Sequence, residues 1–190
     1  MKIAFITTNK HKFEEAQKIL AHFDIEIERL EIDYEENHDS SMETIASNAA
    51  KNLSRKLSRP IITEDTGLFF EAYKNFPGAL PKFVFNSLGY RGIFKLLEGE
   101  THQAYFETAV AYCTPDGEPE IFGGKMKGTI TTEIYNPEID AMPYDRIFIP
   151  DGKSKTISDM TIDEKNELSQ RAESFTKLAK YLVKNSDNLN

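Results

Sequence analysis

Thr63-Glu64-Asp65-Thr66-Gly67-Leu68 is the stretch that decides the fold, because it places two adjacent carboxylates between two apolar runs. Ile61-Ile62 before it is typical of a buried strand, so we expect the carboxylates at the end of that strand. Carboxylates there are commonly solvated, but they can also hold a divalent cation, and one can deprotonate water. Gly67 would let the backbone bend just beyond them. Spacing alone leaves both interpretations open.

Strand and helix patterns alternate on both sides of this stretch. Apolar residues at Ile3–Ile6 predict a buried strand, and alternation over 25–32 predicts a strand with one exposed face. Ser40 and Glu43 have capping-box spacing at the start of a helix that Pro60 ends. Apolar spacing predicts helices at 13–23, 42–57, 84–88, 91–98 and 161–182. Glu14, Glu15, Gln17 and Lys18 are expected on the outer face of the first.

The centre of the chain predicts antiparallel strands. His102–Cys113 indicates one long strand, and the turn Thr114–Gly117 follows it. Glu120–Phe122 and Lys125–Thr131 indicate two more, with Gly123-Gly124 as a bulge or bend between them. Together with the strand–helix repeats, these strands predict an α/β fold with a mixed sheet.

Length and charge exclude several classes of protein. The chain has 190 residues and a formal net charge of −8. The length predicts one domain, residues 1–184, with a fraying tail at 185–190. The negative charge argues against a general partner of nucleic acid or of an anionic membrane. The sequence contains no apolar run of about 18 residues that could span a membrane, and single Cys113 fits a reducing cytoplasm.

Two polar loops are candidates for binding sites. Thr7–Lys12 joins the first strand to the first helix and offers hydroxyls, an amide and lysines where a helix N-terminus attracts anions. The same pattern is typical of an ordinary capped helix. The acidic loop 33–39 is either a solvated connection or a source of metal ligands, with Glu35 or Glu36 opposite Asp65.

Two further segments have both a structural and a functional interpretation. Pro143–Arg146 is either a turn before a strand or a loop on which an aromatic ring stacks on a base. Lys165 and Arg171 lie roughly 240° apart on a continuous helix. They can serve one ligand only if the helix breaks near Ser169, which would then cap a new helix. Otherwise they are solvated charges on a surface helix.

Five stretches, in order, resemble the inosine triphosphate pyrophosphatase family, also called the Ham1-like or noncanonical purine nucleoside triphosphate pyrophosphatases. They are Thr7–Lys12 (family pattern Thr-Gly-Asn-x-x-Lys, with Thr8 for the glycine), Glu64–Leu68 (acidic-Asp-Ser/Thr-Gly-Leu), Phe76–Gly78 (a Pro-Gly turn), Pro143–Asp145 (Phe-Gly-Tyr/Trp-Asp) and Lys165–Arg171 (Lys-Asn, then Ser-His-Arg). The stretches span nearly the whole chain.

The resemblance implies an elongated α/β fold: a long mixed sheet flanked by helices, in two lobes with a central nucleotide cleft. It also implies a homodimer and a Mg²⁺-dependent hydrolase. The enzyme would cleave noncanonical purine triphosphates (ITP, XTP and dITP) between the α- and β-phosphates. The products are a monophosphate and pyrophosphate, and the reaction cleanses the nucleotide pool.

The resemblance also implies roles for individual residues. Asp65 would be the general base and a metal ligand, with Glu36 as the other metal-linked carboxylate. Thr66 would contact the nucleotide. The residues implied for phosphate are Thr7, Asn9 and Lys12, and those implied for base and sugar are Tyr144, Asp145, Lys165, Ser169 and Arg171. Donors on Ser169 and Arg171 would favour a 6-keto purine over adenine.

The chain departs from the family where the base would be read. Gln170 replaces a histidine, Met142-Pro143 replaces Phe-Gly, and Arg146 replaces a proline. We therefore predict that pyrophosphatase activity is retained while base specificity has drifted. One alternative is a related pyrophosphatase acting on modified or pyrimidine nucleotides. The other is a nucleotide-binding sensor with weak catalysis.

Overall fold

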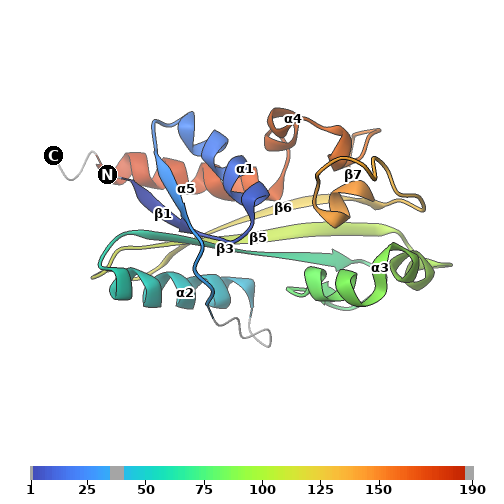
Figure 1. Ribbon diagram of the computed structural model, residues 1–190, viewed down its shortest axis with the longest axis horizontal. Coiled ribbons are helices and arrows are strands. Elements are labelled where there is room, and N and C mark those ends of the chain that lie inside the picture. Colours follow the sequence, from blue (N-terminus) through green and yellow to red (C-terminus); the bar gives the residue numbers. More distant parts are fainter. Residues whose placement is uncertain (1, 35–40, 187–190) are drawn as a thin grey trace.

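The computed structural model describes residues 2–34 and 41–186 and shows one elongated mixed sheet with helices on both faces (Figure 1). The strands are β1 (Ile3–Ile6), β2 (Ile27–Leu30), β3 (Ile61–Phe70), β4 (Pro77–Gly78), β5 (Gln103–Cys113), β6 (Glu120–Ile130) and β7 (Phe148–Pro150). The helices are α1 (Lys10–Ala21), α2 (Met42–Leu57), α3 (Pro81–Leu97), α4 (Ile162–Asn166) and α5 (Gln170–Ser186), with short 3₁₀ turns η1 (Pro143–Arg146) and η2 (Ile157–Asp159).

The predicted α/β fold with a mixed sheet is confirmed. The strand order is β2-β1-β3-β5-β6-β7, and β4 pairs with β3 outside this path. β1 is parallel to β2 and β3, and the remaining pairs are antiparallel. The long strands β3, β5 and β6 set the long axis of the molecule (Figure 1).

The predicted position of the two carboxylates at a strand end is wrong. β3 continues to Phe70, so Glu64 and Asp65 lie in mid-strand, opposite Val110 and Ala109 of β5. The apolar run ends at Ile62, but β5 pairs with the whole of β3 and satisfies the backbone groups that its polar part directs towards β5. Because side chains alternate along a strand, the two carboxylates point to opposite faces of the sheet.

The prediction of two strands separated by a bulge at Gly123-Gly124 is also wrong. β6 runs through both glycines in unbroken register with Ala109 and Thr108 of β5. Gly124 is required by packing: a Cβ there would lie 2.0 Å from the backbone oxygen of Gln170 at the start of α5. The glycine therefore lets the first turn of α5 lie directly on the sheet.

Two apolar cores share one face of the long strands, with polar residues between them. The first core joins Ile62 to α1 and α5, which cover the end of the sheet near β1 (Figure 1). The second joins Leu68 to α3, β5, β6 and β7. Glu64 and Thr66 lie between these positions on the same face of β3. α2 covers the opposite face at the β1 end, against a smaller cluster that includes Ala109 (Figure 1).

Most predicted helix boundaries are close to those observed. α2 is capped by Ser41, whose Oγ accepts from the Thr44 amide, whereas the predicted cap, Ser40, lies outside the described residues. The predicted pair of helices near Gly89 is confirmed, because α3 bends at this residue, with φ of 59°. α5 continues to Ser186, beyond the predicted start of the tail at residue 185. Among the described residues, no helix is long and apolar enough to cross a membrane.

Candidate functional site

The loop between β1 and α1 lies beside an open edge of β3. β1 pairs with β3 only as far as Ile62, and β4 pairs with it only from Leu68. Within the described residues, no strand therefore covers this edge of β3 between Thr63 and Gly67. The residues unpaired at this edge, Thr63–Gly67, belong to the Thr63–Leu68 motif, so this motif lies at the gap in the sheet.

The predicted phosphate-binding residues come together at the N-terminus of α1. Asn9 caps the helix, since its side-chain Oδ1 accepts from the backbone N–H of Lys12 at 3.3 Å. The backbone N–H of Asn9 donates to Thr7 Oγ1 at 3.1 Å. The interpretation as a capped helix is thus confirmed, and phosphate binding stays a prediction. Asn9 Nδ2 also lies 3.7 Å from Met142 Sδ, so the divergent loop before η1 reaches this loop.

A buried ion pair joins β3 to α5. Arg171 Nε donates to Glu64 Oε2 at 2.8 Å, and Arg171 Nη2 donates to Glu64 Oε1 at 3.0 Å. Lys12 Nζ lies 3.2 Å from the same Oε1. Arg171 is only 1% exposed, so these interactions are shielded from water.

A second carboxylate continues the chain of charges. Glu15 Oε2 accepts from Arg171 Nη1 at 2.5 Å, and Glu15 Oε1 lies 2.7 Å from Lys165 Nζ. Lys165 Nζ also donates to Asp145 Oδ2 at 2.7 Å. We call Lys12, Glu64, Arg171, Glu15, Lys165 and Asp145 the charge network. Its three cations alternate with three carboxylates.

Burial and neighbouring charges shift the pKa values of this network in opposite directions, and the neighbouring charges have the larger effect. Burial alone would raise the pKa of Glu15 and of Glu64, but the Arg171 guanidinium and the nearby lysines hold both well below the ordinary value. Burial alone would lower the pKa of Lys165, but Asp145 and Glu15 raise it. The pKa of Arg171 is raised in the same way by Glu15 and Glu64. Glu15, Glu64, Lys165 and Arg171 are therefore charged at neutral pH and stabilise one another.

Of the two interpretations of the C-terminal segment, the helix broken near Ser169 is confirmed, and the continuous surface helix with solvated charges is wrong. α4 ends at Asn166, and α5 begins at Gln170, with Ser169 between them accepting a hydrogen bond from the Ala172 amide at 3.1 Å. Thr161 and Glu164 form the predicted capping box of α4. The break brings Lys165 and Arg171 into one network, which a continuous helix would not allow.

Asp65 and Thr66 lie at the centre of the open edge. The Thr66 amide donates to Asp65 Oδ1 at 3.0 Å. Thr66 Oγ1 lies 2.6 Å from Glu64 Oε1 and 2.7 Å from Thr108 Oγ1. The predicted metal ligand Glu36 and its alternative Glu35 are outside the described residues. Among the residues that are described, no three His, Cys, Asp or Glu side chains cluster as a metal site.

The base-side residues are buried in this conformation. The Tyr144 hydroxyl donates to the Pro81 carbonyl at 3.1 Å, and its ring packs edge-on against Phe85. Burial raises the pKa of Tyr144. Arg146 donates from Nη2 to the Ile139 carbonyl, a hydrogen bond that joins η1 to the segment leading into it. Gln170 is 4% exposed, and its Oε1 has no hydrogen-bond partner among the described residues.

Glu15 is the site residue that sequence reasoning missed. It was expected on the outer face of the first helix, but it is 3% exposed and central to the charge network. The available signal was its position four residues before Ile19, which shares its face of α1 and is buried.

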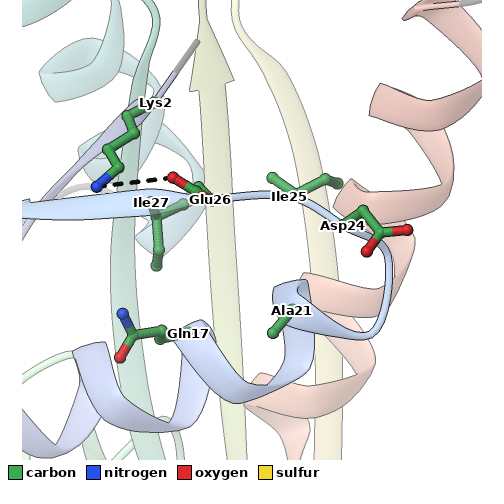
Figure 2. Close-up of a pocket in the computed structure, with 7 residues that line it drawn as sticks. All are labelled: Lys2, Gln17, Ala21, Asp24, Ile25, Glu26 and Ile27. Atoms are coloured by element: carbon green, nitrogen blue, oxygen red, sulfur yellow. Dashed lines mark ion pairs between the residues drawn. The ribbon is translucent and has the colours of Figure 1, made fainter.

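A separate cavity of about 600 Å³ lies away from these residues, between α1 and the segment leading into β2 (Figure 2). Its charged lining includes Lys2 and Glu26, whose Nζ and Oε2 atoms are 3.6 Å apart. Both side chains are largely exposed, and no predicted site residue lines the cavity. It therefore adds nothing to the candidate site.

Known proteins match this chain over nearly its whole length. A model of the Ham1 family matches residues 3–181. A protein of Methanopyrus kandleri named dITP/XTP pyrophosphatase is 40% identical over 186 residues, covering 97% of this chain and 98% of its own. A protein of the same name from Saccharolobus solfataricus is 40% identical over 184 residues, covering 96% and 94%.

Solved structures agree on the fold. A HAM1 protein from Coxiella burnetii has a TM-score of 0.80 at 23% identity, covering 97% of this chain and 99% of its own. A nucleoside-triphosphatase or dITP/XTP pyrophosphatase from Mycobacterium abscessus has a TM-score of 0.68 at 24% identity, covering 88% and 92%. With a family model matched over residues 3–181 and relatives 40% identical along almost the full chain, the protein belongs to the Ham1 family.

Proposed function

We propose that the protein hydrolyses dITP, XTP and ITP to the nucleoside monophosphate and pyrophosphate. The observation that carries the proposal is the convergence of Lys12, Lys165 and Arg171 beside the open edge of β3. A triphosphate carries about four negative charges. Lys12, whose side chain is 20% exposed, can pair with them directly, whereas Lys165 and Arg171 are already paired with carboxylates in this conformation. The names of the relatives support the same reaction.

The phosphate side of the site is formed by α1 and its loop. The helix N-terminus attracts anions, and the Lys12 side chain is the most exposed cation of the charge network, at 20%. Thr7 and Asn9 lie on the same turn and would add a hydroxyl and an amide. Asp65, beside the gap in the sheet, would take a proton from the water that attacks the anhydride between the α- and β-phosphates. Thr66 would contact the nucleotide.

A divalent cation, proposed as Mg²⁺, fits this site as a partner of the substrate. Mg²⁺ usually binds one or two protein carboxylates and completes its shell with phosphate oxygens and water. Asp65 offers one such carboxylate, and Glu36 or Glu35 is proposed as the other. When bound, the cation would neutralise charge on the phosphates during transfer.

The base and sugar would be read by residues at the junction of η1, α4 and α5. These are Tyr144, Asp145, Lys165, Ser169 and Arg171. Three of the five N–H groups of Arg171 donate to Glu15 and Glu64. Arg171 is 1% exposed, so the other two would meet a keto oxygen of the base only once the base side of the site opens. Adenine presents an amino donor at that position, so the site would favour 6-keto purines.

A shifted base preference is the second candidate. The unpartnered Oε1 of buried Gln170 favours it. An amide presents a donor and an acceptor side by side, and can pair with a keto base or, after a flip, with an amino base. A broader substrate range than that of a strict dITP/XTP enzyme would follow.

The proposal also includes the domain organisation, the oligomeric state and the cellular compartment. Residues 1–184 would form a single two-lobed domain with the nucleotide between the lobes, and two copies would form a homodimer. Cys113 is buried and free, which supports a reducing compartment such as the cytoplasm.

The proposal is tested by measuring pyrophosphate release from ITP with and without Mg²⁺, for the wild type and Asp65→Asn. We expect Mg²⁺-dependent release that falls about 10³-fold in the variant, because loss of the base and of a metal carboxylate removes both effects. Circular dichroism checks that the variant is folded. A folded wild-type protein that binds ITP but releases no pyrophosphate contradicts the enzymatic proposal and favours the sensor alternative.

A further inference from the structure

Glu64 is contacted from both sides of the proposed substrate site. Its Oε1 accepts from Thr66 Oγ1 at 2.6 Å and from Arg171 Nη2 at 3.0 Å, and it lies 3.2 Å from Lys12 Nζ. Lys12 belongs to the phosphate side and Arg171 to the base side. Three donors therefore share one carboxylate oxygen, and two of them come from opposite ends of the proposed substrate.

The Arg171 guanidinium is held in one plane by two carboxylates. Glu64 receives its Nε and Nη2 groups, and Glu15 receives its Nη1 group. Because the five N–H groups of arginine form a rigid planar fork, rotation of the guanidinium breaks at least one of these bonds. The orientation of the remaining N–H groups therefore depends on both carboxylates.

Lys12 is the member of this set that can reach a ligand from solvent. Its side chain is 20% exposed, whereas the Glu64 side chain is fully buried and the Arg171 side chain is 1% exposed. If Lys12 turns towards a phosphate, Glu64 Oε1 loses one of its three donors. The carboxylate charge is then shared between fewer donors, and its attraction for Arg171 increases.

We propose that Glu64 is a positioning residue that couples phosphate binding at Lys12 to base recognition at Arg171. The inference rests on the proposed function and deepens it. A triphosphate draws Lys12 away from Glu64 and so fixes Arg171 more firmly against the base. The protein therefore discriminates between keto and amino bases more strongly in triphosphates than in monophosphates.

The test compares base selectivity with phosphate affinity in Glu64→Gln. Selectivity is the ratio of kcat/KM for ITP to that for ATP, and it should fall about tenfold because Arg171 loses a charged partner. Phosphate affinity is measured by calorimetry with inorganic triphosphate, which has no base. It should rise, because Lys12 no longer has a competing carboxylate. A purely structural role for Glu64 would instead weaken both quantities together.

Two variants serve as controls. Glu15→Gln removes the other partner of Arg171 without touching Lys12, so it should lower base selectivity and leave the affinity for inorganic triphosphate unchanged. Glu118→Gln removes an exposed carboxylate that pairs with Lys51, so it should change neither. If Glu64→Gln does not fold, Glu64→Asp keeps the charge but shortens the side chain, and it should also lower selectivity.

The outcomes separate the coupling from the enzymatic proposal. Unchanged selectivity in Glu64→Gln or Glu64→Asp, or weaker binding of inorganic triphosphate by Glu64→Gln, overturns the coupling. A wild-type protein that binds ITP without releasing pyrophosphate overturns the proposed function only. The coupling is then tested by calorimetry with ITP, ATP and the corresponding monophosphates, where the wild type should show the larger base preference among the triphosphates.

Discussion

Replacing Gly124 by alanine tests whether the contact between α5 and the sheet positions the site. The added Cβ would lie 2.0 Å from the backbone oxygen of Gln170 and 2.7 Å from Ser174 Oγ. Real Cβ contacts are essentially never shorter than 3.0 Å, so the first turn of α5 must move away from β6 by at least 1.0 Å. Because backbone rather than a flexible side chain is in the way, rotamer changes cannot relieve the clash.

The expected cost follows from this displacement. Overpacking of this kind destabilises a protein by about 1–3 kcal/mol, which lowers Tm by about 2–12 °C in a chain of this size. The same shift moves Ser169 and Arg171, which flank Gln170 at the start of α5. A misplacement of about 1 Å can reduce a rate by about 100-fold, so pyrophosphate release from ITP should fall by about that factor.

The neighbouring glycine provides a matched control. A Cβ on Gly123 would meet nothing nearer than the Thr108 backbone oxygen at 4.0 Å, and this residue is exposed. Gly123→Ala should therefore leave Tm and activity close to those of the wild type. Thermal melts and pyrophosphate release are measured on both variants. If Gly124→Ala melts and turns over like Gly123→Ala, then α5 does not rest on β6 as described, and the reasoning is wrong.

Two further predictions concern the pH dependence of stability and the reading of the base. Burial would raise the pKa of Glu15, but Arg171 and Lys165 outweigh burial and lower this pKa in the folded protein. The charged Glu15 carboxylate therefore stabilises the fold at pH values above its ordinary pKa of 4.5. This stabilisation is lost as the pH falls below 4.5. Urea denaturation between pH 7 and 3 should show a free energy of unfolding that decreases below pH ~4.5, and a rise there would contradict the assignment. Gln170→His should raise the ratio of kcat/KM for ITP to that for ATP about tenfold, because an imidazole that directs an N–H at the base donates to a 6-keto oxygen and offers no acceptor to an amino group. A ratio that does not change would show that residue 170 does not read the base.

The elements of the fold were largely predictable because their signals are local. Apolar period, capping residues and turn residues act within a few positions, and they located most of the helices and the bend at Gly89. The break before Ser169 was one of two alternatives, which the local pattern left open. The two errors in the sheet have a common cause. The length of β3 and the continuity of β6 depend on pairing with β5, and no short window of sequence contains that information.

The candidate site was predictable in part. Motif resemblance selected Lys12, Asp145, Lys165 and Arg171, which the structure brings together in one network. It did not select Glu15, which looked like one more solvated acidic residue on an amphipathic helix. Nor did it show that adjacent Glu64 and Asp65 face opposite sides of the sheet, which follows only once both are known to lie within β3.

The sequence by itself determined most of the helices and strands, their order, the α/β class and the motifs that resemble the family. Only the tertiary structure decided which charges meet. Glu64 and Arg171 are 107 residues apart in the chain, and Glu15 and Arg171 are 156 apart. Their pairing depends on how α1, β3 and α5 pack against one another, and it is stable because the same packing excludes water. Residues that are ordinary surface charges in the sequence thus become a buried network through long-range packing.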